Sequence, residues 1–324
     1  MKPYFRFGLS LSLLVVYSCT PEEKVADVFD YSSLTDNERR LSSNAVVGLE
    51  THAELETTLF AAEPMLVNPT NIDIDERGRV WVTEGYNYRN RIHKNNPVKE
   101  LGDRIVILED EDGDGKADTS KVFYQGADIN AALGILVLGN KVIVSCSPLV
   151  MMLTDTDGDD KADKKEILLT GIEGVQHDHG VHAFVFGPDG KLYFNFGNNG
   201  TRLLDKDGNP ILDKATGAEI NNSGKPFREG MIFRSDRDGS NIEVLAHNFR
   251  NNYEVAVDSY GTLWQSDNDD DGNRGARINF VMEYGNYGYK DEMTGAGWRA
   301  PRTGMNDSIP LRHWHHRYYI VVPL

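Results

Sequence analysis

Short runs of alternating apolar and polar residues, paired around tight turns, recur from about residue 67 onward. The runs are rich in Val, Ile, Phe, Tyr and Trp, the residue types that favour strands. The copies are NIDIDERGRVWVTEG (71–85), AFVFGPDGKLYFNFG (183–197) and EVAVDSYGTLWQSD (254–267), with a weaker one at 138–142. Alternation with a period of two around Asp-Gly and Asn-Lys turns predicts antiparallel hairpins, and no stretch shows strong helical periodicity.

A second repeat is interleaved with the first. The segment RIVILEDEDGDGKADTSKVFYQG (104–126) aligns with LVMMLTDTDGDDKADKKEILLTG (149–171) at a constant shift of 45 residues, and shorter Asp-Gly turns follow at 205–208 and 236–239. Repeats of a few tens of residues indicate a fold that is built from similar units.

Both repeats together predict an all-β protein, a β-propeller of four-stranded blades. The blade units lie near residues 67–126, 127–172, 175–247 and 248–310. A β-sandwich is the alternative, but it does not explain why the two turn types alternate in order. Because four blades are few for closure and the chain stops at HWHHRYYIVVPL, we expect a sequence that is shortened, or shifted in frame near Arg317, relative to a longer protein. A complete four-bladed propeller is the other possibility.

Composition narrows the classes of partner. The 324 residues are 40% hydrophobic and 26% charged, which is typical of a globular protein, and the formal net charge is −16. Such a surface repels phosphate backbones, so nucleic acid is a poor partner. Two cysteines exclude a disulfide-dense scaffold. Cys146 lies in an apolar strand-like run and is expected to be a buried, inert thiol.

The amino terminus has the pattern of an export signal. Lys2 and Arg6 precede an apolar stretch, residues 7–17, that is too short to span a bilayer. After this stretch comes the small residue Ser18, and then Cys19. A small residue directly before a cysteine at this place is the bacterial lipoprotein pattern; an ordinary secretory signal is the alternative. We therefore expect residues 1–19 to be a lipoprotein signal, 20–65 a polar tether and 66–324 the propeller. The protein would be exported and lipid-anchored to the bacterial outer membrane.

The Asp-rich turns are candidate calcium sites. The D-x-D-x-D spacing places carboxylates on one side of a turn, where they can share a hard cation. Gly115 supplies the sharp bend of an EF-hand-like loop in the first turn, whereas Asp160 replaces it in the second. Solvated acidic turns without a tight site are the alternative, and calcium held here would be structural. The candidate ligands are Asp110, Asp112, Asp114 and Asp118; Asp155, Asp157, Asp159 and Asp163; and, in a third group, Asp267, Asp269 and Asp271.

Two further segments carry candidate chemistry. In QHDHGVHAF, His179 is a candidate general base beside Asp178, since a partly buried histidine can titrate near neutral pH. A metal site formed with His177 and His182, or a hydrogen-bonded turn histidine, are the alternatives. Arg250 precedes a predicted strand on a loop that would line one end of the propeller, where it can clamp a carboxylate; a surface ion pair is the alternative.

Together these segments resemble the quinoprotein sugar dehydrogenases, the glucose/sorbosone dehydrogenase group. The likeness rests on Asp178-His179 followed by the segment FGPDGKLY (186–193), on HNFRN (247–251), and on QSD (265–267) with the downstream RIN and GNYGY. Asn252 stands where that family has a proline. The Asp-rich turns and the lipoprotein start are closer to large membrane-bound dehydrogenases of planctomycetes, verrucomicrobia and bacteroidetes.

The resemblance implies a six-bladed propeller that carries pyrroloquinoline quinone (PQQ) and calcium. His179 would be the base, Asp178 would orient it, and Arg250 with Asn251 would contact the quinone. The implied substrate is a sugar or another alcohol, and the electron acceptor would be a cytochrome c. The competing hypotheses are a non-catalytic, calcium-stabilised surface propeller that binds glycans or protein partners, and a calcium-dependent hydrolase of the lactonase-like kind.

Overall fold

The computed structural model describes residues 30–90, 92–175, 179–268, 276–290 and 292, and the chain divides into two compact units at Thr57 and Thr58. The described part of the first unit contains only single-turn helices, namely η1 (Tyr31–Ser33), α1 (Asp36–Arg39), α2 (Ser42–Ala45) and η2 (Val46–Gly48). A capping box between Thr35 and Glu38 begins α1. The expected tether therefore has some local helical structure. No helix in the described ranges is long and apolar enough to cross a membrane.

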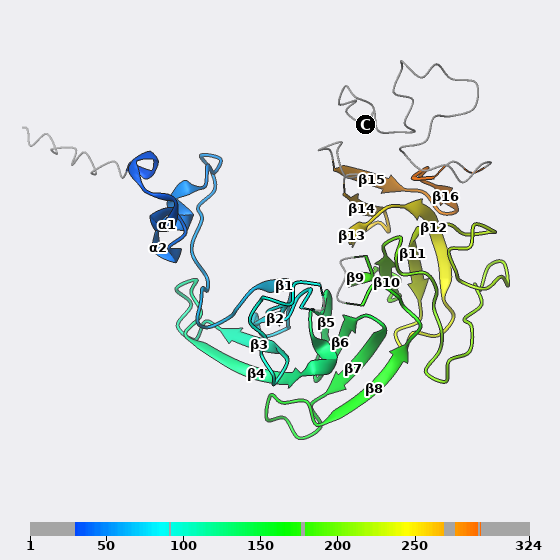
Figure 1. The fold of residues 1–324 in the computed structure, drawn as a ribbon, viewed down its shortest axis with the longest axis horizontal. Helices are drawn as coiled ribbons and strands as arrows, with labels where there is room; N and C mark the ends of the chain where they lie inside the picture. Colours follow the sequence, from blue (N-terminus) through cyan, green and yellow to red (C-terminus); the bar gives the residue numbers. More distant parts are fainter. Residues whose placement is uncertain (1–29, 91, 176–178, 269–275, 291, 293–324) are drawn as a thin grey trace, which may run out of the picture. The chain divides into compact units, whose positions relative to one another are not determined.

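The second unit is built from four small antiparallel sheets that form the blades of a β-propeller (Figure 1). The strands of blade 1 are β1 (Pro69–Ile74), β2 (Val80–Glu84), β3 (Asp103–Glu109) and β4 (Thr119–Gly126), and those of blade 2 are β5 (Gly134–Leu138), β6 (Lys141–Cys146), β7 (Leu149–Thr154) and β8 (Lys164–Leu169). The remaining strands are β9 (Val181–Phe186), β10 (Leu192–Phe196), β11 (Gly230–Ser235) and β12 (Glu243–Phe249) in blade 3, and β13 (Asn252–Val257), β14 (Leu263–Asp267) and β15 (Arg277–Val281) in blade 4. The predicted all-β propeller is confirmed, and the first three sheets lie within about two residues of the predicted units, whereas the end of the fourth unit lies outside the described residues.

Sequence and structure differ at the edge of blade 3. The short strand β16 (Gly285–Asn286) pairs in parallel with β12, so the chain returns from blade 4 to the outer edge of the preceding blade. Blade 4 has three strands among the described residues.

Apolar faces of successive blades pack against one another. Strand β1 lies beside β5, β5 beside β9, and β9 beside β13, so these first strands form the inner wall. Alternate side chains of each sheet point to opposite neighbours: Trp81 of blade 1 belongs to the cluster shared with blade 2, while Val82 belongs to a cluster on the other face. Phe194 joins the cluster between blades 2 and 3, and Leu263 the cluster between blades 3 and 4.

The outer faces of blades 1 and 4 keep large apolar side chains exposed. On blade 1, Ile72 and Ile74 are 57% and 59% exposed; on blade 4, Trp264, Ile278 and Phe280 are 39%, 64% and 51% exposed. These are the faces on which a further blade would pack in a larger ring. The six-bladed ring implied by the family resemblance stays a prediction.

Residues 58–65, which the sequence places in the tether, pack against blade 1 instead, together with Leu66. Phe60, Ala61, Met65 and Leu66 contact the cluster that contains Val82. The carbonyl of Phe60 accepts a hydrogen bond from the Ala117 N–H at 2.8 Å, just as the carbonyl of Phe123 accepts one from Ala162 at 2.9 Å. The segment thus accepts a hydrogen bond from the Asp-rich turn of blade 1, as the outer strand of blade 1 accepts one from the Asp-rich turn of blade 2.

Candidate functional site

Antiparallel pairing gives each blade two distinct ends. Strands β9, β13 and β15 begin at the end where β10, β12 and β14 finish. His179, Asn198, the pair Arg250–Asn251 and Asp267 all lie at this end, which we call the histidine end. The two Asp-rich turns connect β3 to β4 and β7 to β8, so they lie at the opposite end, which we call the turn end. The predicted residues therefore fall into two separate groups.

His179 is held by a residue that the sequence did not single out. Its side chain is buried, and Nδ1 lies 2.5 Å from Oδ1 of Asn198. Because an amide oxygen only accepts hydrogen bonds, this contact places the proton on Nδ1 and leaves Nε2 as the basic nitrogen. Asp178, which was expected to orient the imidazole, lies outside the described residues, as does His177. Asn198 has the orienting position in the described site.

The turn that carries Asn198 is fixed from several directions. The Asn198 N–H donates to the carbonyl of Arg250 at 2.6 Å, and its own carbonyl accepts from Nδ2 of Asn222 at 2.9 Å. The neighbouring Gly197 N–H donates to the carbonyl of Gly180 at 3.0 Å. The imidazole, the Asn198 turn and the Arg250 backbone are thereby joined as one unit.

Asp267 anchors the backbone that presents Arg250 and Asn251. Its fully buried carboxylate accepts the N–H groups of these two residues at 3.3 and 2.9 Å, and Nη2 of Arg277 at 2.6 Å. Nη1 of Arg250 donates to Oδ1 of Asn268 at 2.5 Å, and the Arg250 side chain is buried. Asp267 thus supports the site through N–H donors on both oxygens. Its predicted role as a metal ligand stays a prediction, and Asp269 and Asp271 lie outside the described residues.

Asn251 presents an acceptor toward the same turn. Its Oδ1 is buried and receives no hydrogen bond from the described part of the chain. A Cβ on Gly197 would lie 2.5 Å from this oxygen and 3.1 Å from Cα of His179, so only glycine fits between the two residues. The site therefore combines an oriented imidazole, a buried guanidinium and a buried amide oxygen that has capacity for a ligand hydrogen bond.

The third histidine of the predicted segment has a structural environment. His182 is fully buried, its Nδ1 lies 2.7 Å from the carbonyl oxygen of Asn252, and its ring stacks on Tyr253 at 4.6 Å. Within the described ranges, the groups of three side chains that are close enough to share a metal ion contain only aspartates. The alternative of a histidine metal site gains no support from His179 and His182.

The Asp-rich turns bring together part of each predicted ligand set. Carboxylate oxygens of Asp110, Asp112 and Asp118 lie within 4.8 Å of one another, and so do those of Asp155, Asp157 and Asp159. Asp114 and Asp163 are outside these two groups; Asp163 accepts hydrogen bonds from the N–H and hydroxyl of Thr156.

Both turns keep their first aspartate ionised. A backbone hydrogen bond from Gly115 is the largest influence that lowers the pKa of Asp110. At Asp155, burial alone would raise the pKa, but backbone N–H groups led by Gly158 outweigh it and lower the pKa. These two carboxylates therefore favour the charged form that a hard cation requires.

Sequence reasoning missed Asn198 because it lies 19 residues after His179, in the turn that follows the next strand. The signal that points to it is positional. FGNNG follows a buried strand that must end where the strand after His179 begins, so its polar residues reach the same end. Arg277 was noted only as the first residue of the RIN motif; its ion pair with Asp267 was not predicted, because the two residues meet across the β14–β15 pair.

Comparison with known proteins gives one family match. The domain of unknown function DUF7133 matches residues 42–305. No curated protein matches the chain.

Several solved structures are similar at low identity. The PQQ domain of pyranose dehydrogenase from Coprinopsis cinerea is 20% identical with a TM-score of 0.44, covering 63% of this chain and 44% of that one. PQQ-bound aldose sugar dehydrogenase from Streptomyces coelicolor is 16% identical with a TM-score of 0.48, covering 72% and 66%. A calcium structure of a family AA12 carbohydrate-active enzyme from Trichoderma reesei is 16% identical with a TM-score of 0.48, covering 76% and 60%. This chain thus spans between 44% and 66% of the length of these three chains.

Proposed function

This chain belongs to the family of the domain of unknown function DUF7133, and we propose that it is a quinoprotein-type oxidoreductase that oxidises a sugar or another alcohol. The observation that carries the proposal is the contact of His179 with Asn198 beside Arg250 and Asn251. This contact orients the candidate base, and the Asn198 turn also bonds to the backbone of Arg250, so the base and a buried cation lie together at the histidine end.

The chemical groups of Arg250 and Asn251 are of the types that can bind a quinone with carboxylate groups. PQQ carries three carboxylates, and the buried Arg250 guanidinium is suited to bind one of them. The buried Oδ1 of Asn251, which has no hydrogen-bond partner among the described residues, has capacity for a polar ligand atom. Arg250 and Asn251 are therefore the residues that would hold the quinone. When bound, PQQ would accept the hydride from the carbinol carbon of the substrate.

The chain itself would handle the proton. Nε2 of His179 is the basic nitrogen in the tautomer that Asn198 selects, so it would take the proton of the substrate hydroxyl. Asn198 is a positioning residue, because it acts on the substrate only through His179. The fixed turn around Asn198 keeps the imidazole from rotating between turnovers.

We also propose that the two Asp-rich turns bind calcium as structural sites. The grouped carboxylates in each turn support this, and their place at the turn end separates them from His179. A calcium ion beside the quinone would need other ligands than these turns. We propose Asp267 and its neighbours as those ligands.

The export pattern that ends at Cys19 extends the proposal to the location of the protein. Residues 1–19 lie outside the described part, and the support comes from the sequence alone. We propose an exported, lipid-anchored protein that reacts outside the cytoplasm and passes electrons to a cytochrome c.

The direct test is titration of the full chain with PQQ and calcium by calorimetry, together with a dye-linked oxidation assay on sugars. Saturable quinone binding, with turnover that His179→Ala abolishes while quinone binding persists, is the expected result. Absence of quinone binding in a folded protein whose melting temperature still rises with calcium would contradict the enzyme. That result would favour a non-catalytic binding propeller.

A further inference from the structure

The connection between β10 and β11 folds back beside its own beginning. It comprises residues 197–229 and starts with the turn that carries Asn198. A β-bridge between Arg202 and Asn221 pairs this start with a later segment, residues 219–223. The later segment is therefore a fixed neighbour of the Asn198 turn.

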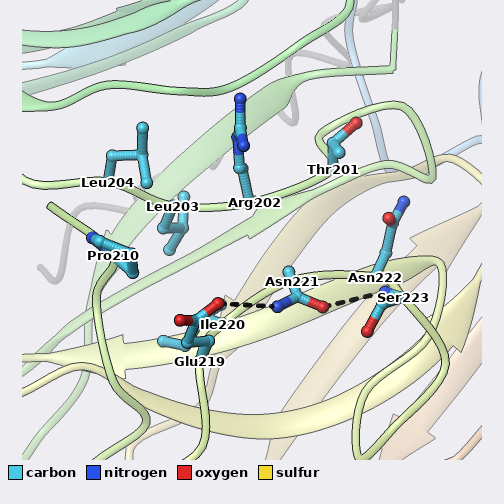
Figure 2. A pocket seen from close by; sticks show the side chains of 10 residues that line it. All are labelled: Thr201, Arg202, Leu203, Leu204, Pro210, Glu219, Ile220, Asn221, Asn222 and Ser223. Carbon is cyan, nitrogen blue, oxygen red and sulfur yellow. Dashed lines mark hydrogen bonds between the residues drawn. The ribbon is translucent and has the colours of Figure 1, made fainter. Parts of the chain in front are cut away.

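Asn222 is the residue of the later segment that bonds to the Asn198 turn. Its backbone N–H donates to the carbonyl of Thr201 at 2.8 Å, and its Nδ2 donates to the carbonyl of Asn198 at 2.9 Å. Thr201 and Asn222 lie on facing segments that border one hollow of the connection (Figure 2). Because the backbone bond fixes where the side chain begins, the amide donor of Asn222 has a defined direction toward the turn.

The turn that Asn222 supports has a backbone that needs support. It consists of residues 197–201 and is closed by a hydrogen bond from the Gly200 N–H to the carbonyl of Gly197 at 2.8 Å. Thr201 has a φ of 65°, in the left-handed region that β-branched residues rarely adopt. Such a conformation persists only where surrounding contacts hold it, and the Asn222 N–H is one of these contacts.

Asn198 bonds to three separate parts of the described site. Its N–H donates to the carbonyl of Arg250, its carbonyl accepts from Asn222, and its Oδ1 contacts Nδ1 of His179. The backbone of Asn198 is thus held on one side by the loop of Arg250 and on the other by Asn222. Removal of the Asn222 amide would release one of these two backbone bonds and let the Asn198 side chain shift relative to the imidazole.

We propose that Asn222 is a positioning residue for His179. It fixes the Asn198 carbonyl, and through Asn198 it fixes the amide oxygen that holds the proton on Nδ1. Asn222 acts from the Nδ1 side of the ring, so it would affect the substrate through His179. The proposal rests on the proposed function, because a fixed tautomer matters for turnover only if His179 is the working base.

Nitrogen NMR of the imidazole in the quinone-free full chain tests this role without turnover. The wild type should show a neutral ring with the proton on Nδ1. Without a fixed acceptor at Nδ1 a neutral imidazole populates both tautomers, so Asn222→Ala should give a mixture of the two. Asn222→Ser, whose hydroxyl is one bond shorter than the amide, is a second variant with the same expectation.

The matched control is Asn221→Ala, which removes the same amide from the adjacent residue. Asn221 bonds to Glu219 at 3.5 Å and to the Ser223 N–H at 3.0 Å within the later segment (Figure 2). A general loosening of residues 219–223 would therefore change both variants, whereas a positioning role changes only the Asn222 variants.

Kinetics of the quinone-loaded enzyme give the second readout. Asn222→Ala should lower kcat about fivefold and leave KM unchanged, because the substrate contacts persist and only the orientation of the base is lost. A wild-type tautomer in both Asn222 variants, or equal changes in Asn222→Ala and Asn221→Ala, would overturn the positioning role even if quinone binding and turnover are found. A mixed tautomer in the Asn222 variants alone, in a protein that binds no quinone, would support the positioning of His179 and contradict the oxidoreductase.

Discussion

Nδ1 of His179 lies 2.5 Å from Oδ1 of Asn198, so an uncharged amide faces the imidazole where a carboxylate would give an ion pair. An amide fixes the tautomer without stabilising the imidazolium form. Asn198 therefore orients the imidazole through an uncharged contact.

Replacement of Asn198 by aspartate tests this relationship through pH. A carboxylate would stabilise the charged imidazole and raise the pKa of His179, so the basic form would require a higher pH. We expect the acid limb of the kcat/KM profile for Asn198→Asp to move upward by about one pH unit. Asn198→Ala should lower kcat by an order of magnitude or more, because the imidazole loses its fixed orientation.

The control is Asn95→Asp, an exposed residue of another connection, which should leave the profile unchanged. An Asn198→Asp profile identical to that of the wild type would show that this residue does not face the working base. Titration of the His179 imidazole by NMR gives the same pKa without turnover.

Arg250 allows a second prediction, on quinone affinity. Its buried guanidinium donates to Oδ1 of Asn268, and its backbone N–H donates to Asp267. We expect Arg250→Ala to weaken PQQ binding by about tenfold or more, and Arg250→Lys less, because lysine keeps the charge but not the planar donor pair. Calorimetry in the presence of calcium measures both, with Arg237→Ala at the turn end as the control. If quinone binds equally well to Arg250→Ala, the assignment of this cation is wrong.

Calcium binding at the Asp-rich turns predicts stabilisation without an effect on catalysis. At a calcium concentration about 100-fold above Kd, one site contributes about 2.7 kcal/mol, which corresponds to a rise in Tm of about 5 °C in a domain of this size. Asp110→Asn and Asp155→Asn should each reduce the rise, since each removes a member of one carboxylate group.

Scanning calorimetry with and without calcium provides the measurement, with Asp207→Asn in an exposed turn as the control. Turnover should be unchanged in both variants, because the turns lie at the opposite end of the sheets from His179. An undiminished calcium-induced rise in Tm in the double variant would place calcium elsewhere.

Asp160 links the two Asp-rich repeats to fold stability. It stands where the first repeat has Gly115, and it accepts hydrogen bonds from Arg79 at 2.8 Å and Lys121 at 2.9 Å on blade 1. Burial alone would raise the pKa of Asp160, but these two cations outweigh it and lower the pKa from 3.8 to about 2. A depressed pKa stabilises the fold above the unfolded-state value and loses that contribution as the pH falls from about 4 toward 2.

Asp160→Asn should therefore cost about 2 kcal/mol of unfolding free energy at neutral pH, and the difference from the wild type should vanish near pH 2. Asparagine tolerates the left-handed backbone at this position, where φ is 64°, so the substitution removes the charge and not the turn. Urea unfolding between pH 2 and 7 measures the difference. A pH-independent difference would mean that the contact is steric and not electrostatic.

The strands were predictable because successive side chains of a strand point to opposite faces of its sheet, and alternation such as NIDIDERGRVWV has this period of two. The 45-residue repeat likewise placed the two Asp-rich turns at equivalent positions. Contacts between residues on different strands could not be predicted, because they have no pattern in the local sequence. Asn198 meets His179 only because β9 and β10 are antiparallel neighbours, and Arg277 meets Asp267 only through the register of β14 and β15.

The assignment of residues 58–65 to the tether differs from the structure for another reason. This segment has neither alternation nor a turn signal, so its polar context suggested a tether. Its apolar residues are instead spaced to cover the exposed face of blade 1, a tertiary effect that no local pattern reports.

That coverage gives the last prediction. Phe60 and Met65 pack on the cluster that contains Val82, while the Phe60 carbonyl bonds to the Ala117 N–H. Phe60→Ala keeps the backbone hydrogen bond and removes only the ring, so its effect reports apolar packing alone. For a partly buried phenylalanine we expect a loss of about 2 kcal/mol, and about twice that when Met65→Ala is added. Leu55→Ala, in the first unit and 67% exposed, is the matched control and should change the unfolding free energy by less than about 0.5 kcal/mol. Equal stability of Phe60→Ala and the control in urea would show that residues 58–65 are a tether that does not stabilise blade 1.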